Sequence, residues 1–153
     1  MKNILLLVSA GLLLTHCQTP KIAAATPGIL NQEMQISLNQ KITLRDDNKK
    51  DLGEITFMHL DESRCPANVR CVRQGAAVTT FSVQTNLAEN QNIRLFIGDF
   101  MANDSRNRRN LTADTVVVQL NDKNRYQFIL TAVVPYPGTS DEAVAATILL
   151  KRP

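Results

Sequence analysis

The sequence contains no tryptophan, and aromatic residues of all kinds make up only 5% of its 153 residues. Proteins that bind single-stranded nucleic acid stack aromatic side chains on the bases, and this chain has few residues that could do so. Its formal net charge of +3 is also too small to indicate a nucleic-acid partner. We therefore expect no nucleic-acid ligand.

Histidine is scarce as well, and its scarcity limits acid–base catalysis. His16 lies in an N-terminal segment that we expect to be removed, which leaves His59 as the only histidine of the mature chain. A Ser-His-Asp triad would need His59 together with Asp61 and Ser63. On a strand His59 and Asp61 share a face, but Ser63 begins an irregular loop. We expect no catalytic residues and no enzyme activity.

A metal site is the next function that the composition disfavours. The only candidate zinc ligands that cluster in the sequence are His59, Asp61, Cys65 and Cys71. Their spacings match neither the Cys-x-x-Cys nor the His-x-x-x-His pairs that are typical of zinc sites. We expect neither a metal nor a cofactor.

The chain has no apolar run long enough to span a bilayer, but its first residues have the pattern of a signal peptide. Lys2 precedes a short apolar run over residues 4–14, and the run stops at Cys17. The segment Leu14-Thr15-His16-Cys17 resembles a bacterial lipobox, although His16 replaces the usual small residue. The resemblance implies cleavage before Cys17 and acylation of its sulfur. The alternative is cleavage after Ala25, which would release the protein without an anchor.

These features divide the chain into three parts. We expect a lipoprotein signal peptide over residues 1–16, a lipidated N-terminus and tether over 17–31, and a single domain over 32–153. The acylated Cys17 would hold the protein in the bacterial cell envelope, and we expect the outer membrane.

The cysteine count agrees with export, because one cysteine is used for lipid and two remain. In an oxidising compartment Cys65 and Cys71 would form a disulfide that closes a short ring. Pro66 stiffens this ring, and we expect Arg64 and Arg70 to project from it. The predicted partner-binding loop consists of Ser63, Arg64, Pro66, Ala67, Asn68, Val69 and Arg70. The alternative is that the disulfide only stabilises a long connection between two strands, as is common in small exported domains.

Beyond Gln32 apolar residues alternate with polar ones, which is typical of half-buried strands. Eight such segments are separated by turn-forming residues. They cover residues 34–38, 42–44, 53–60, 76–83, 93–97, 116–120, 126–134 and 143–150. Seven to eight short strands indicate an all-β fold, a small antiparallel barrel or sandwich with one disulfide.

The cysteine segment resembles a motif of small uncharacterised exported bacterial proteins that reads D-S-R-C-P, a few residues, then V-x-C-V-W-A-G. The matching residues are Ser63, Arg64, Cys65, Pro66, Val69, Cys71, Val72 and Gly75. Glu62 is extra, and Arg73-Gln74 replace the Trp-Ala pair. The resemblance implies an exported β domain. In size, anchor and architecture the chain is also loosely similar to the potempins, which are lipid-anchored protease inhibitors.

Together these features predict a lipid-anchored β domain that binds a protein partner through the disulfide-constrained loop. In its most concrete form this is a protease inhibitor whose loop occupies a protease cleft in an extended conformation. The alternative is a surface adhesin or structural lipoprotein that uses the loop containing Arg106, Arg108 and Arg109. That arginine loop also fits a purely solvated connection.

Overall fold

The structure is a computed structural model that describes residues 27–87, 90–101 and 103–152, and within them it contains ten β-strands and no helix. The strands are β1 (Gly28–Ile29), β2 (Glu33–Ser37), β3 (Lys41–Arg45), β4 (Asp51–Glu62), β5 (Ala76–Gln84), β6 (Gln91–Phe100), β7 (Arg109–Leu111), β8 (Asp114–Gln119), β9 (Arg125–Val134) and β10 (Ala145–Lys151). The predicted signal peptide, the acylated Cys17 and the alternative cut after Ala25 lie outside the described residues.

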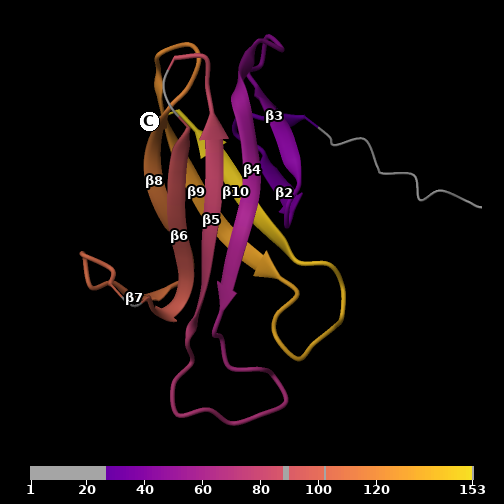
Figure 1. Cartoon of the computed structure of the whole chain (residues 1–153), viewed down its shortest axis with the longest axis vertical. Helices are drawn as coiled ribbons and strands as arrows, with labels where there is room; N and C mark the ends of the chain where they lie inside the picture. The colour runs from indigo at the N-terminus through magenta and orange to yellow at the C-terminus, as the bar shows by residue number, and fades with distance from the viewer. Residues whose placement is uncertain (1–26, 88–89, 102, 153) are drawn as a thin grey trace, which may run out of the picture.

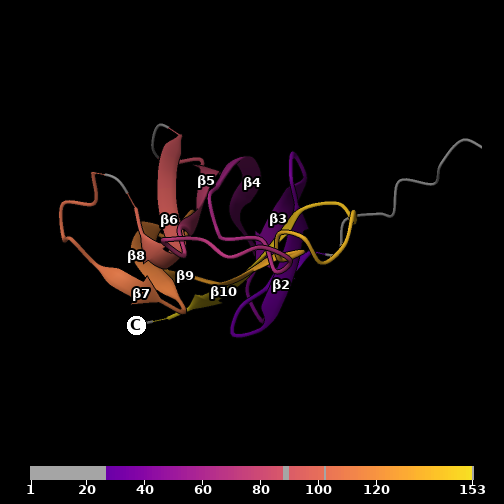
Figure 2. The ribbon, with the colours of Figure 1, turned by 90° about the horizontal axis from the view of Figure 1, so that it is seen from below.

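The strands form two facing sheets (Figure 1). The first has the order β1-β3-β4-β5-β6-β7, and the second has the order β2-β10-β9-β8. All pairs are antiparallel except β1 with β3. Seen from below, the larger sheet curls around the smaller one (Figure 2). The predicted all-β fold with one disulfide is therefore confirmed, with β1 and β7 added to the eight predicted strands.

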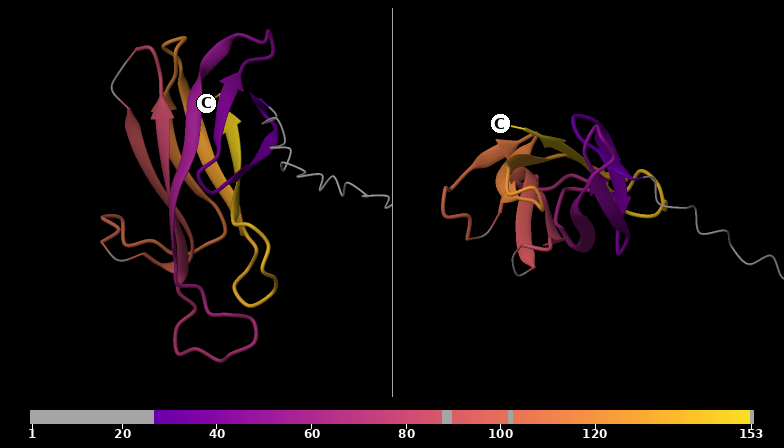
Figure 3. Two further views of the ribbon diagram at one scale, coloured as in Figure 1. Left: turned by 45° about the vertical axis from the view of Figure 1, so that its right-hand side comes forward. Right: turned by 90° about the horizontal axis from the view of Figure 1, so that it is seen from above.

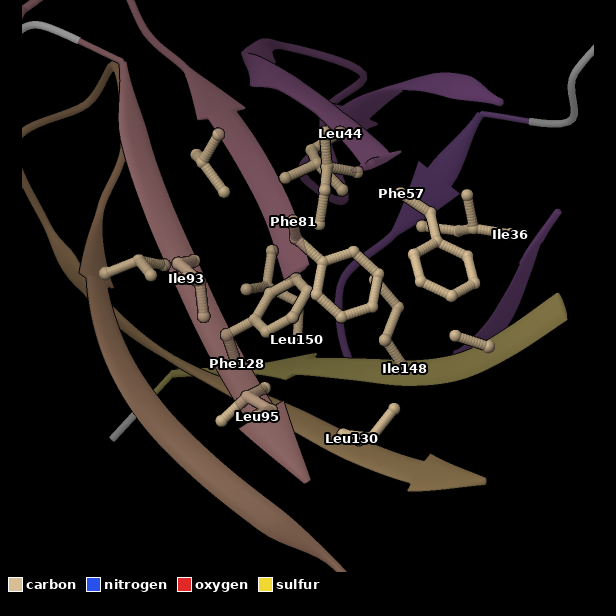
Figure 4. Close-up of a cluster of buried hydrophobic side chains, with 14 of the residues drawn as sticks. Ile36, Leu44, Phe57, Phe81, Ile93, Leu95, Phe128, Leu130, Ile148 and Leu150 are labelled. Atoms are coloured by element: carbon tan, nitrogen blue, oxygen red, sulfur yellow. The ribbon is translucent and has the colours of Figure 1, made fainter. Parts of the chain in front are cut away.

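The core lies between the two sheets, where the alternating apolar residues of the sequence meet (Figure 4). Phe57 of β4 packs on Phe81 of β5 with ring centroids 5.0 Å apart, and Phe81 contacts Phe128 of β9 across the core at 5.2 Å. All three rings are fully buried. Burying one such side chain contributes roughly 1.5–3 kcal/mol, so this aromatic row does much to join the sheets.

A β-bulge in β4 changes which residues face the core. The register with β5 shifts between Phe57 and His59, so Met58 is left out of the ladder. Met58 is half exposed, while Leu60 packs against the core. The alternation predicts that Leu60 and Met58 share a face, and this prediction is wrong because a bulge inserts one residue into the period of two.

Strand β5 is buried on both of its faces, not on one as its alternation predicts. Ala77, Thr79, Phe81 and Val83 face the main core. On the opposite face a second cluster contains Ala76, Val78 and Phe96, and Met101 and Leu111 pack against it. The connection from β6 to β7 supplies Met101, and β7 supplies Leu111, so the predicted polar loop covers the outer face of the larger sheet.

The fold begins earlier than the predicted boundary at residue 32. Gly28 pairs with Leu44 of β3, and Leu30 is only 3% exposed. The amide of Asn31 donates a hydrogen bond to the carbonyl of Leu150 at 2.8 Å. Residues 28–31 thus belong to the domain, and the predicted tether is shorter by this stretch.

Within the residues that the structure describes, no helix is long and apolar enough to cross a membrane.

Candidate functional site at the cysteine loop

Two loops project together from one end of the domain (Figure 3). The cysteine loop, residues 63–75, connects β4 to β5, and the β9–β10 loop covers residues 135–144. The described chain starts near β3, toward the opposite end of β4 (Figure 1). A strand rises about 3.3 Å per residue, so the twelve residues of β4 separate these ends by roughly 40 Å.

The base of the cysteine loop is held by a disulfide and by backbone hydrogen bonds. Cys65 and Cys71 are bonded, with their Cα atoms 5.8 Å apart, as predicted. The amide of Ser63 donates to the carbonyl of Ala76 at 2.9 Å, and that of Cys65 donates to Gln74 at 2.7 Å. Gly75 has φ +67, and a Cβ there would lie 1.8 Å from the Ser63 carbonyl oxygen. Only glycine fits this close approach.

Arg64 is the main contact between the two loops, and it lies inside the molecule. Its Nη1 donates to the carbonyl of Val133 at 3.0 Å and its Nη2 to that of Pro135 at 3.4 Å. Glu62 neutralises the guanidinium through an ion pair at 2.5 Å, and the guanidinium carbon lies 4.9 Å from the centre of the Tyr136 ring. The expectation that Arg64 projects toward a partner is wrong, because only 9% of the residue is exposed.

The tip of the ring is a turn. The amide of Val69 donates to the carbonyl of Pro66 at 3.2 Å, which closes residues 66–69 into a tight bend. The β9–β10 loop braces this bend, since the amide of Ala67 donates to the carbonyl of Pro137 at 2.9 Å. The expectation of an extended segment is therefore not met over residues 66–69.

The exposed part of the cysteine loop combines apolar and cationic side chains. Val69 is 52% exposed and Val72 is fully exposed, and both Arg70 and Arg73 face solvent. A shallow hollow of about 390 Å³ lies beside them, and Tyr136 of the neighbouring loop forms part of its wall. Single exposed apolar residues are common on surfaces, but two on a braced loop, each followed or flanked by an exposed arginine, form a surface suited to a protein contact.

The predicted loop residues therefore divide into two groups. Ser63, Ala67, Asn68, Val69 and Arg70 are exposed, whereas Arg64 is buried and Pro66 is partly covered. The side chain of Ser63 is also engaged in the loop: its Oγ donates to the carbonyl of Ala76 and accepts from the Ala76 amide.

The catalytic and metal alternatives gain no geometric support. His59 Nε2 lies 2.8 Å from Asp61 Oδ1 on an exposed face, as the strand pattern predicts, but Ser63 Oγ bonds to backbone atoms of Ala76. Both cysteines near these residues are bonded to each other. In residues 27–87, 90–101 and 103–152, no three His, Cys, Asp or Glu side chains are placed to hold a metal ion.

The arginine loop, described over residues 101 and 103–108 between β6 and β7, is held by contacts within the loop and with β6 and β8. Arg108 bonds to Asp104 at 3.0 Å and to the buried Asp114, and its guanidinium lies 4.9 Å from the Phe96 ring centre. The hydrogen bonds from Arg108 lower the pKa of Asp104 to about 2. The hydrogen bond to Asp104 in turn raises the pKa of Arg108, against the effect of its partial burial.

Only part of the predicted arginine cluster faces solvent. The side chain of Arg106 is 60% exposed and reaches no nearer than 3.9 Å to Asp114. Arg109, the first residue of β7, is also exposed. The side chain of Arg108 bonds within the domain, so the adhesin alternative retains Arg106 and Arg109 as exposed arginines that could contact a partner.

The sequence reasoning missed three residues that shape these sites. Tyr136 stacks on Arg64, Val72 is the most exposed apolar residue of the cysteine loop, and Asp114 is the buried partner of Arg108. Val72 lies in the cysteine segment that the sequence already singles out. Asp114, which follows the polar connection, gives no local sign that it is buried.

Comparison with known proteins found no match among protein-family models, curated proteins or solved structures.

Proposed function

We propose that this protein is a lipid-anchored β domain of the bacterial envelope that binds a protein partner through the cysteine loop, most concretely a protease that it inhibits. One observation carries the proposal: Val69, Arg70, Val72 and Arg73 are exposed on a loop whose base is fixed by the disulfide and by Arg64. The function requires contact, not turnover.

The braced geometry favours tight binding. A free loop loses conformational entropy when a partner orders it, and pre-ordering reduces that cost. Here the turn at residues 66–69, its bond to Pro137 and the buried Arg64 already restrict the loop. The partner would meet a shape that changes little on binding.

The surface chemistry suggests how a protease would be engaged. Because residues 66–69 form a turn, the loop would enter the protease cleft with this turn first and not as an extended strand. Arg70 and Arg73 would then lie beside Val69 of the turn. A protease cut within the ring would leave both ends joined through Cys65 and Cys71. The cleaved loop would therefore keep its shape and dissociate only slowly from the protease.

The position of the loop also suits an anchored protein. The chain enters the domain at β1, near one end of β4, and the cysteine loop follows the other end. An acylated Cys17 would hold the first end at the membrane and leave the loop directed away from it. This arrangement supports a partner in the space beyond the membrane surface.

The experiment is an inhibition assay of the oxidised protein against serine, cysteine and metalloproteases at micromolar concentration. We expect one class to be inhibited, and we expect the double variant Arg70→Ala/Arg73→Ala to lose at least tenfold in inhibition, since interface arginines commonly contribute 1–2 kcal/mol or more, about 1.4 kcal/mol being tenfold.

The matched control neutralises two arginines at the other loop, Arg106→Ala/Arg109→Ala, and leaves the structural Arg108 in place. This variant should inhibit as well as the parent. A lack of inhibition across the whole panel removes the protease version. Loss of cell-surface adhesion in the Arg106/Arg109 variant alone would favour the adhesin alternative.

A further inference from the structure

A basic hollow lies at the end of the domain opposite the cysteine loop. Lys123, Asn124, Arg125 and Arg152 line a space of about 470 Å³ between the β8–β9 turn and the end of β10. Three of these four residues are cationic, and they come from two segments that are far apart in the sequence. The hollow shares no lining residue with the one beside the cysteine loop.

The β8–β9 turn is held by its own hydrogen bonds. Both oxygens of Asp122 are occupied: Oδ1 accepts from the amide of Asn124 at 3.0 Å, and Oδ2 accepts from the Tyr126 hydroxyl at 2.5 Å and from the Asn124 side chain at 2.8 Å. The amide of Lys123 donates to the carbonyl of Leu120 at 2.9 Å. The turn therefore presents Lys123 and Arg125 on a fixed backbone.

The other wall is fixed by an aromatic contact. The guanidinium carbon of Arg152 lies 6.0 Å from the centre of the Tyr126 ring, which is itself anchored to Asp122. A cation held over an aromatic face keeps its outer N–H groups available for another acceptor.

The charge of the hollow is only partly neutralised within the described chain. None of the three cations takes part in a salt bridge among the described residues. The acidic residues that act on Arg152 are Asp122, whose oxygens are already bonded, and Asp46 of the β3–β4 turn. Three cations against two carboxylates, of which that of Asp122 is already fully hydrogen-bonded, leave a net positive site that attracts an anion.

The hollow also lies where the chain enters the domain. The amide of Asn31 bonds to the carbonyl of Leu150, two residues before Arg152. Between an acylated Cys17 and the first described residue there are about ten residues, and such a chain spans at most roughly 35 Å. On the proposed anchor, the end of the domain that carries the basic hollow is held toward the membrane surface.

We propose that the basic hollow binds a phosphate-type anion, and that in the anchored protein the head groups of anionic phospholipids supply it. Arginine binds phosphate oxygens through paired N–H groups, and lysine adds a point charge, so this residue set suits a phosphate monoester or diester. The space is larger than one phosphate ion and accommodates a glycerophosphate group. The choice of lipid as the source rests on the proposed anchor, whereas the anion site itself does not.

The test uses the expected mature chain, residues 17–153, with Cys17→Ser, so that neither the apolar signal segment nor an acyl chain contributes to binding. Sedimentation with vesicles of pure phosphatidylcholine, and of phosphatidylcholine with 30 mol% phosphatidylglycerol, measures partitioning. In parallel, NMR titration with inorganic phosphate and with glycerol 3-phosphate follows the amides of residues 122–126 and 150–152. We expect binding to the anionic vesicles and shifts at these amides.

The decisive variant is Lys123→Gln/Arg125→Gln/Arg152→Gln, and its matched control, Arg70→Gln/Arg73→Gln/Arg106→Gln, removes the same charge elsewhere. Each cation near an anionic surface contributes about fivefold, so the hollow variant should partition roughly 100-fold more weakly. Circular dichroism and thermal unfolding test whether both variants are folded.

Each outcome decides the matter. Loss of vesicle binding in the hollow variant alone supports the head-group site, and amide shifts with phosphate but no vesicle binding support the anion site with a soluble source. Equal losses in both triple variants, or no response to any anion, overturn the proposal. The protease assay reads the opposite end, so failure of one proposal leaves the other standing.

Discussion

The cysteine loop and the arginine loop are both arginine-rich connections, yet they differ in what they leave exposed. Each has one internal arginine: Arg64 bonds to backbone carbonyls at the end of β9 and the start of the β9–β10 loop, and Arg108 bonds to Asp104 and Asp114. The cysteine loop extends from the end of the sheets, while the arginine loop helps to cover a second apolar cluster. The number of arginines in a loop therefore says less about binding than the position of their acceptors.

The substitution with the largest expected effect removes a buried hydrogen-bond acceptor that supports the arginine loop. Asp114→Ala removes a carboxylate whose side chain is 1% exposed, so the amide of Phe96 loses its acceptor and Arg108 keeps only Asp104. We expect a loss of about 3–5 kcal/mol in the free energy of unfolding, measured by urea denaturation, because one guanidinium and two backbone amides lose their hydrogen bonds to a charged acceptor together. Arg106→Ala is the control and should change stability by less than about 0.5 kcal/mol. A loss below about 1 kcal/mol in the aspartate variant would show that the arginine loop does not depend on it.

The substitution with the next largest expected effect concerns Arg64, the internal arginine of the cysteine loop. Arg64→Met keeps the length of the side chain but removes its bonds to Val133 and Pro135 and leaves Glu62 unpaired. We expect a loss of about 2–3 kcal/mol, as for hydrogen bonds from a charged group. Hydrogen exchange at residues 136–139 should become faster at the same time. Arg70→Met, which alters an exposed arginine of the same loop, should leave both measurements unchanged.

Part of this picture could be predicted from the sequence. Period-two alternation locates eight strands, and the cysteine count gives the disulfide. The same alternation places His59 and Asp61 on one face of their strand. These features depend on neighbours in the sequence or on a simple count, which is why they can be recognised without a structure.

The remainder depends on contacts between distant segments. Arg64 looks like an exposed arginine until Val133, 69 residues later, supplies its acceptor. The burial of β5 on both faces needs Met101 and Leu111, which arrive from a segment that appears polar. The β-bulge at Met58 changes which of the following residues of β4 face the core, and the local sequence does not indicate the bulge. Tertiary packing overrides local pattern in each case.

A smaller effect separates the disulfide from the other supports of the cysteine loop. Cys65→Ser/Cys71→Ser opens a ring of seven residues, and we expect a loss of about 2 kcal/mol in the free energy of unfolding. Because Arg64 and the Ser63–Ala76 backbone bond remain, exchange in β4 and β5 should stay slow. Fast exchange throughout β4 would mean that the disulfide alone orders this end. Reduction of the parent protein should reproduce the result of the variant.

The smallest effect is a pH dependence confined to the arginine loop. Asp104 has its pKa lowered from 3.8 to about 2 by hydrogen bonds from Arg108. Stabilisation by a carboxylate with a lowered pKa is present above about pH 4 and is lost as the pH falls toward 2. The stability difference between the parent and Asp104→Asn should therefore shrink across this window. A difference that stays constant from pH 5 to pH 2 would contradict the role of this pair, and Asp141→Asn provides an exposed control.

The opposite positions of chain entry and cysteine loop also determine how the domain carries mechanical load. A pull between β1 and the loop runs along β4, so the ladder hydrogen bonds on either side lie across the force and share it. β1 pairs with β3 over only two residues, and it is the first part that such a pull would detach. A pull by the proposed partner on the cysteine loop would therefore release β1 first. This would lengthen the tether by a few residues and leave the two sheets intact.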